Sequence, residues 1–209
     1  YRRNQIIEMN DIKTYKSTLG YTFAPKQKVW EPFKNVIKGK KFSIIKDFNL
    51  GLNPSNLNFR LDIDRRYSEL QNRNNDNFKS IVPVLYDKTF SIGRVYGWKW
   101  NLAKSLSVDY AATANSWIEE PFGALNTPEK KDSMWQNFYS LGRLNNFNQT
   151  VNANYSVPLR KIKALDWVTL TTRYSANYEW RNAPPANQNL GNTIQNARTI
   201  GLNGNMNFI

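Results

Sequence analysis

Alternation of polar and apolar residues is the feature that most constrains the fold of this chain. In the clearest run, residues 146–157, Asn, Thr and Ser alternate with Phe, Val, Ala and Tyr. A period of two places unlike residues on opposite faces of a β-strand. Alternation also predicts strands over residues 15–24, 41–52, 56–64, 89–100, 105–116, 165–178 and 194–208. No segment indicates a helix, so the sequence predicts an all-β fold of about eight strands.

The predicted connections between these strands alternate between long and short. An N-terminal connecting segment is expected over residues 1–14. Long loops are expected at 25–40, 65–88, 117–145 and 179–193. Short turns are expected at 53–55, 101–104 and 158–164. If neighbouring strands pair antiparallel, all short turns lie at one end of the sheet, which is typical of outer-membrane barrels. We therefore expect antiparallel up-and-down strands in a transmembrane β-barrel.

The two strand faces indicate which residues would meet water and which would meet lipid. A strand of about ten residues, tilted by roughly 40°, rises about 25 Å, which matches the apolar band of such a barrel. The polar faces suit a water-filled lumen, and the candidate pore-facing residues are Asn58, Arg60, Asp62, Asn148, Asn152, Asn154, Thr171 and Arg173. Tryptophans near strand ends suit the membrane interface. These candidates are Trp98, Trp100, Trp117, Trp167 and Trp180.

Charged residues refine this interpretation. The basic turn at 158–164 carries Arg160, Lys161 and Lys163, which we interpret as a rim that meets lipid headgroups. Arg and Lys near a strand end can reach the interface, but in mid-strand they need the protein interior or a partner surface. Three cations fall on otherwise apolar predicted faces, namely Lys46, Arg94 and Arg198.

Composition excludes several kinds of chemistry. The chain contains no Cys and no His, so it has no Ser-His-Asp triad, no thiol nucleophile and no imidazole or thiolate metal site. The acidic pair in Glu119-Glu120-Pro121 has no second catalytic element and is interpreted as a loop start. We expect no enzyme activity and no cofactor. The net charge of +13 lies mostly outside the strand faces, which argues against nucleic acid.

Several strings in the chain resemble the SprA/Sov family, the outer-membrane translocon of the type 9 secretion system of Bacteroidetes. They keep their order over most of the sequence and include Leu19-Gly20-Tyr21-Thr22-Phe23, Trp30-Glu31-Pro32-Phe33, Leu52-Asn53-Pro54-Ser55-Asn56, Tyr96-Gly97-Trp98-Lys99-Trp100, Ile118-Glu119-Glu120-Pro121, Leu165-Asp166-Trp167-Val168, Tyr178-Glu179-Trp180 and Leu190-Gly191-Asn192-Thr193. Where the family pattern has Asp-Glu-Pro, this chain has Glu119-Glu120-Pro121. The match carries no catalytic residues.

This resemblance implies that the chain is one segment of a very large single-chain barrel in the bacterial outer membrane. The barrel would export folded cargo proteins and support gliding motility. The resemblance also implies partners, which are a PorV-like barrel that shuttles cargo and a plug protein that seals the pore. Two alternatives stay open from the residues alone. One is a stand-alone eight-stranded barrel that serves as an adhesin or porin, and the other is a soluble β-rich module that binds polysaccharide.

Overall fold

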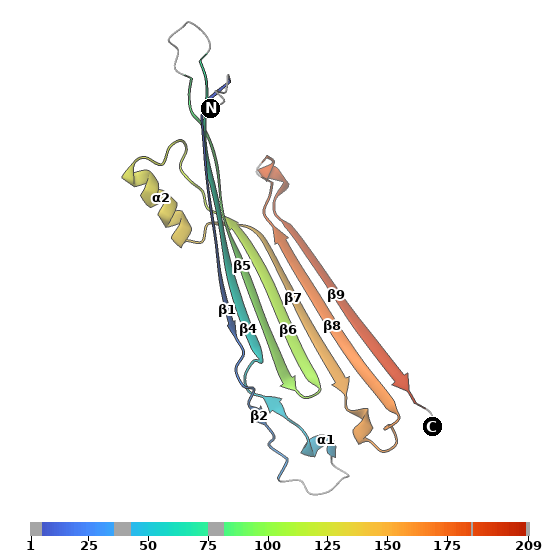
Figure 1. Ribbon diagram of the computed structural model, residues 1–209. Helices are drawn as coiled ribbons and strands as arrows, with labels where there is room; N and C mark the ends of the chain where they lie inside the picture. The colour runs from blue at the N-terminus through green and yellow to red at the C-terminus, as the bar shows by residue number, and fades with distance from the viewer. Residues whose placement is uncertain (1–5, 36–42, 75–81, 185, 208–209) are drawn as a thin grey trace. The chain divides into compact units, whose positions relative to one another are not determined.

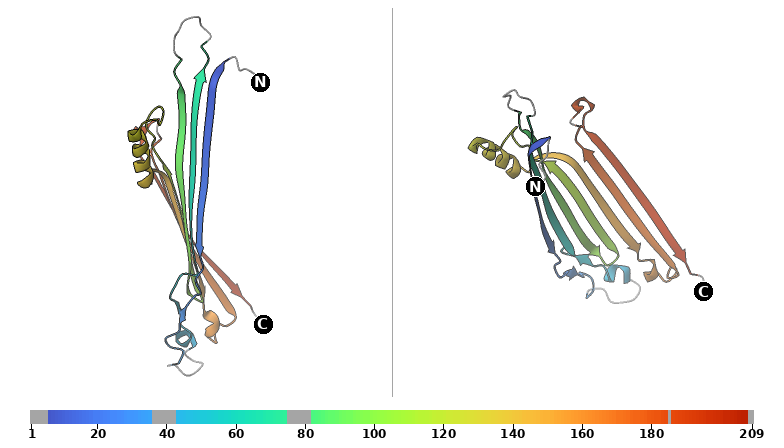
Figure 2. Two further views of the ribbon diagram at one scale, coloured as in Figure 1. Left: turned by 60° about the vertical axis from the view of Figure 1, so that its left-hand side comes forward. Right: turned by 45° about the horizontal axis from the view of Figure 1, so that its top comes forward.

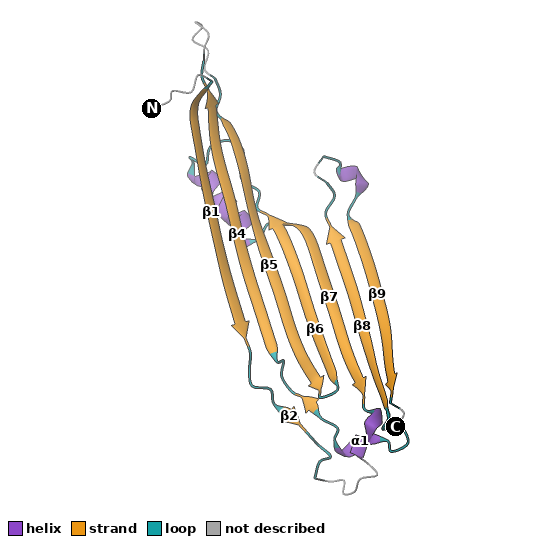
Figure 3. Cartoon of the chain, turned by 45° about the vertical axis from the view of Figure 1, so that its right-hand side comes forward, coloured by secondary structure: helices purple, strands orange, loops and turns teal. Residues whose placement is uncertain are grey.

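One antiparallel sheet dominates the computed structural model, which describes residues 6–35, 43–74, 82–184 and 186–207. Its seven strands are arranged in the order β1-β4-β5-β6-β7-β8-β9, so each strand lies beside its neighbour along the chain (Figures 1 and 3). Their bounds are β1 Ile7–Phe23, β4 Asn56–Asn72, β5 Leu85–Ala103, β6 Leu106–Trp117, β7 Arg143–Val157, β8 Val168–Arg181 and β9 Thr193–Met206. The prediction of an all-β, antiparallel fold is confirmed.

The chain divides into two compact units, and most strands contribute to both. The first unit comprises Tyr1–Leu19, Leu61–Arg94 and Ala114–Asn145. The second comprises Gly20–Arg60, Val95–Thr113 and Asn146–Ile209.

The first unit has a hydrophobic core that includes a helix. Helix α2, Pro128–Tyr139, packs on one side of the strands and buries Met134 against Phe90, Ile92 and Ile118 (Figure 2). The prediction that the chain contains no helix is therefore wrong. The local signals are present, because Thr127 caps the helix by accepting a hydrogen bond from the Lys130 N–H at 3.4 Å, and proline occupies the first turn.

The second unit contains a small two-stranded sheet where the sequence predicted a long strand. Over 41–52, the described residues form helix α1, Ser43–Lys46, and the short strand β3, Leu50–Gly51. Strand β3 pairs with β2, Val29–Trp30, in the middle of the predicted loop at 25–40. Residues 36–42 lie outside the described part of the chain. The alternation failed as a guide here because the Gly51 backbone packs against the Asn101 carbonyl oxygen, and its own carbonyl accepts from Trp100 Nε1 at 2.9 Å.

Several predicted boundaries are also wrong. Strand β1 begins at Ile7, inside the predicted connecting segment 1–14. Strands β4 and β5 extend well into the predicted loop 65–88, of which residues 75–81 lie outside the description. These extensions carry charged residues that interrupt the alternation, and contacts distant in sequence hold them. For example, the Arg73 N–H donates to the Ile6 carbonyl at 2.7 Å.

Smaller shifts occur at the remaining turns and loops. The predicted turn 101–104 moves to Lys104-Ser105, because β5 continues to Ala103. The connection that begins at Pro158 contains a 3-10 turn, η2, Leu159–Lys161, and continues through Trp167 before β8 starts. In the loop 179–193, β8 continues to Arg181, and η3, Gln188–Leu190, precedes β9.

These shifts change the expected pattern of long and short connections. Without a strand at 41–52, one long connection joins β1 to β4. It lies at the same end of the second unit as the turn at Lys104-Ser105, as the hydrogen bond from the Lys104 N–H to Asn49 Oδ1 demonstrates at 2.6 Å (Figure 1). The predicted separation of all long loops from all short turns is therefore wrong.

Candidate functional site

The register of β7, β8 and β9 gives the sheet two chemically different faces. Residues paired directly across antiparallel strands point to the same side. On one side, Asn152 pairs with Ser175, and Asn154 pairs with Arg173 and through it with Gly201. On the other side, the paired rows are apolar in most positions. They comprise Phe147, Trp180 and Ile194; Ala153, Tyr174 and Ile200; Tyr155, Thr172 and Leu202; and Val157, Leu170 and Gly204.

Ring contacts and a hydrogen bond extend the apolar face across the second unit to β4. Phe59 packs against Tyr96 with ring centres 5.4 Å apart. Trp98 packs against Tyr110 at 6.0 Å, and the Tyr110 hydroxyl donates to Gln149 Oε1 at 3.1 Å. Since residues alternate along each strand, Asn58 and Arg60 lie on the opposite, polar face with Asn148.

The candidate pore-facing residues thus share one side of the strands in the second unit. Seven of them belong to this unit, namely Asn58, Arg60, Asn148, Asn152, Asn154, Thr171 and Arg173. In the first unit, Asp62 accepts a hydrogen bond from Thr18 Oγ1 at 2.9 Å. Neutral hydrogen-bonding groups dominate the polar face of β7 and β8, as in the Thr150–Asn177 side-chain hydrogen bond of 2.9 Å. This surface suits contact with water.

The apolar face of the second unit is extensively exposed. Exposed fractions are highest on the edge strand β9, at 72% for Leu202 and 62% for Ile200, and they are 39% for Tyr155 and Tyr174 on β7 and β8. Among the described residues, Ala112 is the only buried hydrophobic residue of this unit, whereas the first unit buries Phe90, Ile92 and Ile118 against Met134 of α2. Large contiguous apolar patches on a protein surface mark contacts with another protein or with a membrane.

The five candidate interface tryptophans occupy different environments. Trp98 and Trp100 lie on the apolar side near the end of β5 and contact each other at 5.9 Å. Trp180 pairs with Phe147 and Ile194 near the other end of the second-unit strands, and Trp167 precedes β8 with its Nε1 donating to Ala164. Trp117 differs. Its neighbour in β6, Ser116, accepts a hydrogen bond from Arg94 on the apolar side. Because successive side chains of a strand point to opposite faces, Trp117 points to the polar side.

A strand-end cluster joins the long β1–β4 connection to the ends of β5 and β7. Its charged members are Glu31, Lys34, Asp47, Lys104 and Lys161. Glu31 accepts from Lys104 Nζ at 2.7 Å and from Lys34 Nζ at 2.5 Å, and these hydrogen bonds lower the pKa of Glu31 to about 2. Lys161 binds Asp47 at 2.8 Å and lowers the pKa of that carboxyl. A cavity of about 710 Å³ lies among these residues.

The three candidate headgroup-binding cations therefore have unequal roles. Lys161 is paired with Asp47, and Arg160 donates to Thr169 Oγ1 at 3.3 Å. Lys163 is exposed. Sequence reasoning missed Glu31 and Asp47 because Lys104 and Lys161, which join them to the strand ends, lie far along the chain.

In the first unit, two cations fix the loop that leads to α2. The Arg65 guanidinium binds Glu120 with both carboxylate oxygens, at 2.5 Å and 3.1 Å. The Lys88 ammonium donates to the carbonyls of Pro121, at 2.7 Å, and Gly123. Sequence reasoning assigned Glu120 to a loop start and did not find its half-buried partner Arg65. The signal was absent because Arg65 fell in a predicted loop.

No protein-family model and no curated protein matches the sequence. No helix in the described part of the chain is long and apolar enough to cross a membrane. Across residues 6–35, 43–74, 82–184 and 186–207, no three His, Cys, Asp or Glu side chains gather to hold a metal ion.

Proposed function

We propose that this chain is a stretch of the wall of a very large transmembrane β-barrel in the bacterial outer membrane. The observation that carries the proposal is the exposed apolar face of the second unit opposite a polar face. In water, an exposed sheet face with Ile194, Ile200 and Leu202 would be unfavourable. In lipid the same face is favourable, provided that every backbone group pairs within the sheet.

The polar face would then line a wide aqueous lumen. Its asparagines, threonines and serines offer hydrogen bonds without a strong net charge, and β7 alone contributes Asn146, Asn148, Asn152 and Asn154. Such a surface passes a protein without binding it tightly. The barrel would thus be a passive conduit with no bond chemistry of its own.

The resemblance to the SprA/Sov family makes the proposal more specific. The chain would belong to the protein-conducting channel of a type 9 secretion system, which exports folded cargo and supports gliding motility. A PorV-like barrel and a plug protein would be its partners. The cations of the short connections would lie near lipid headgroups, with Arg160 and Lys163 free of acidic partners in the described residues.

The sheet topology favours this proposal over a stand-alone small barrel. A closed barrel of this chain alone would pair β1 with β9, but in the described sheet these strands are the two edges. An eight-stranded barrel also has an interior filled by side chains and could not pass a protein. A soluble polysaccharide-binding module would leave the apolar face of the second unit in water.

The proposal is tested by obstructing the lumen of the intact protein in cells. This stretch contains no Cys, so a single cysteine can be introduced and modified with a bulky polyethylene glycol maleimide. Modification of Asn152→Cys or Thr171→Cys, on the polar face, should block release of folded cargo. The matched variants Val151→Cys and Leu170→Cys, on the apolar face, should export normally. Undiminished export after full modification at both polar positions would refute the proposed function.

A further inference from the structure

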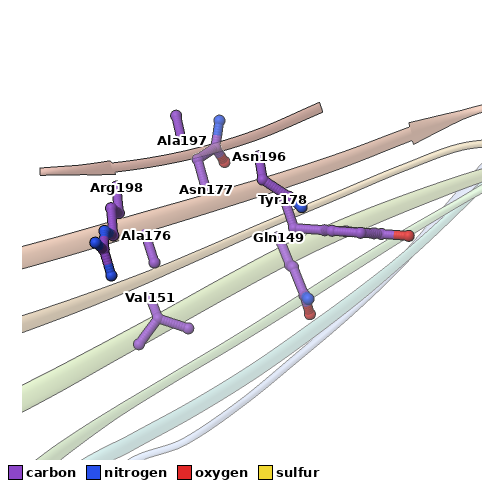
Figure 4. Close-up of a pocket in the computed structure, with 8 residues that line it drawn as sticks. All are labelled: Gln149, Val151, Ala176, Asn177, Tyr178, Asn196, Ala197 and Arg198. Carbon is purple, nitrogen blue, oxygen red and sulfur yellow. The ribbon is translucent and has the colours of Figure 1, made fainter. Parts of the chain in front are cut away.

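The cavity of the strand-end cluster concentrates positive charge. Its volume of about 710 Å³ is typical of sites that bind small molecules. The charged side chains that line it are Glu31, Lys34, Lys46, Asp47, Lys104 and Lys161. Four ammonium groups thus accompany two carboxylates, which leaves an excess of two positive charges. By contrast, the hollow of about 310 Å³ beside the edge strand β9 has a single charged side chain, Arg198 (Figure 4).

Contacts within the protein leave ammonium donors of this cavity available. Glu31 is half-buried between the exposed side chains of Lys34 and Lys104, which share its carboxylate. Each ammonium has three N–H donors, so both lysines keep donors for a ligand. Lys46 belongs to helix α1 and not to the predicted strand, and it is half-buried. No acceptor among the described residues pairs with Lys46.

The remaining wall of the cavity is largely apolar and adjoins the apolar face of the second unit. Its apolar members are Phe48, Leu106, Tyr155 and Pro158. Tyr155 pairs on the apolar side with Thr172, and β7 ends at Val157. Leu106 lies on the same side as Tyr110, because side chains alternate along β6. The cavity therefore lies where the apolar face ends and positive charge begins.

The cavity is built before any ligand binds. Asn49 is buried, and it accepts from the Lys104 N–H at 2.6 Å while its amide donates to the Asp47 carbonyl at 2.8 Å. The Lys161–Asp47 ion pair joins the same segment to the connection that follows β7, and Figure 3 shows α1 beside this connection. Strands β6 and β7 have neighbours on both sides in the sheet. A preorganised site of this kind loses little free energy to ordering when it binds a ligand.

We propose that this cavity binds a lipid whose headgroup carries a phosphate monoester. The phosphate would lie among Lys34, Lys46 and Lys104, and the acyl chains would follow the apolar face past Tyr155. A phosphate monoester carries about two negative charges near neutral pH, which complements the excess charge of the cavity. A soluble anion would leave the apolar wall unused. The proposal rests on the proposed function, because it takes the apolar face as the one that meets lipid.

The test is amide hydrogen exchange of the intact protein in lipid nanodiscs. Nanodiscs of phosphatidylcholine alone are compared with nanodiscs that also contain phosphatidic acid, a lipid phosphate monoester. The amides of Phe48 and Lys104 are read, because both donate hydrogen bonds at the cavity. With phosphatidic acid at ten times its dissociation constant, their exchange should slow about tenfold, because opening must first release the lipid. Excess glycerol 3-phosphate, which lacks acyl chains, should have little effect.

Substitution of Lys46 tests the source of the charge without breaking a contact among the described residues. Lys46→Gln should weaken binding about tenfold, which would reduce the slowing to about twofold. Lys46→Arg should keep the full slowing. Lys28→Gln is the matched control, because Lys28 is exposed on the same connection and does not line the cavity. In phosphatidylcholine alone, all three variants should exchange like the unmodified protein.

Three outcomes would overturn the proposal. Unchanged exchange with phosphatidic acid would show that the lipid does not bind. Equal slowing with glycerol 3-phosphate would show that the site takes a soluble anion. Equal losses in Lys46→Gln and Lys28→Gln would show that diffuse surface charge, and not the cavity, attracts the lipid. Slow reaction of Val151→Cys with an aqueous thiol reagent reports lipid contact of the apolar face separately, so these outcomes leave the proposed function intact.

Discussion

Removing one partner of the Arg65–Glu120 ion pair should release the loop that leads to α2. The Glu120 side chain is 3% exposed, and the pair is bidentate at 2.5 Å and 3.1 Å. The Arg65 guanidinium also lies 5.7 Å from the Phe90 ring centre. Loss of one partner from a buried pair costs about 3–5 kcal/mol. Because the Arg65 side chain is 21% exposed, water offsets part of this penalty, and we expect about 2–3 kcal/mol for Glu120→Gln.

Amide hydrogen exchange of α2 measures this loss as a local opening free energy. A change of about 2–3 kcal/mol corresponds to roughly 30- to 140-fold faster exchange. The double variant Arg65→Met with Glu120→Gln should exchange more slowly than either single variant, because no unpaired charge remains buried.

The neighbouring Arg143–Glu119 pair is a matched control in the same loop. Its nitrogen and oxygen are 3.4 Å apart, and its side chains are 46% and 66% exposed. Glu119→Gln should therefore accelerate exchange by less than about fivefold. The assigned role of the buried pair is wrong if Glu119→Gln and Glu120→Gln accelerate exchange equally. It is also wrong if the loss of opening free energy in the double variant equals the sum of the losses in the two single variants.

Three further predictions concern the second unit. The Glu31 contacts should be constant above pH 4.5 and be lost as the pH falls from about 4.5 towards 2, because the folded state lowers the pKa of Glu31 to about 2; Glu31→Gln should reduce this dependence of cluster protection in hydrogen exchange and leave the part that comes from Asp47. Gly51→Ala should lower the unfolding temperature in calorimetry, because the added methyl group would collide with the Asn101 backbone carbonyl oxygen, whereas Gly97→Ala should change it little, because the Asn58 side chain that it meets can move away. Leu202→Arg should cost up to about 2–4 kcal/mol of folding in lipid, and Asn203→Arg almost nothing, as read from heat-modifiable gel migration.

The sequence predicted well where one strand face is apolar and its partner strands are adjacent in the chain. Residues 146–157 alternate with the single exception of Gln149, and they form most of β7. The polar candidates Asn152 and Asn154 pair with Ser175 and Arg173 on one side of the sheet, as period-two reasoning implies. The local alternation is sufficient there because the polarity of each side chain indicates the face of the sheet on which it lies.

The sequence failed where distant contacts, and not alternation, determine the local structure. Alternation over 41–52 suggested a strand, but the described residues form the short helix α1 and the short strand β3, which hydrogen bonds from Trp100 and Lys104 hold in place. The charged residue Arg65 concealed the extension of β4, because its partner Glu120 lies in another loop. Helix α2 carried a recognisable cap at Thr127, but its few apolar residues gave weak helical periodicity.

The central claim is that one face of this sheet meets lipid and the other meets water. Single cysteines at consecutive residues 150–155 of β7, in the intact protein in native membranes, test it directly with a charged, membrane-impermeant thiol reagent. Labelling should alternate, rapid at Thr150, Asn152 and Asn154, and slow at Val151, Ala153 and Tyr155 until the membrane is dissolved and the protein unfolded. Equal labelling at neighbouring positions, or the opposite alternation, would contradict the account.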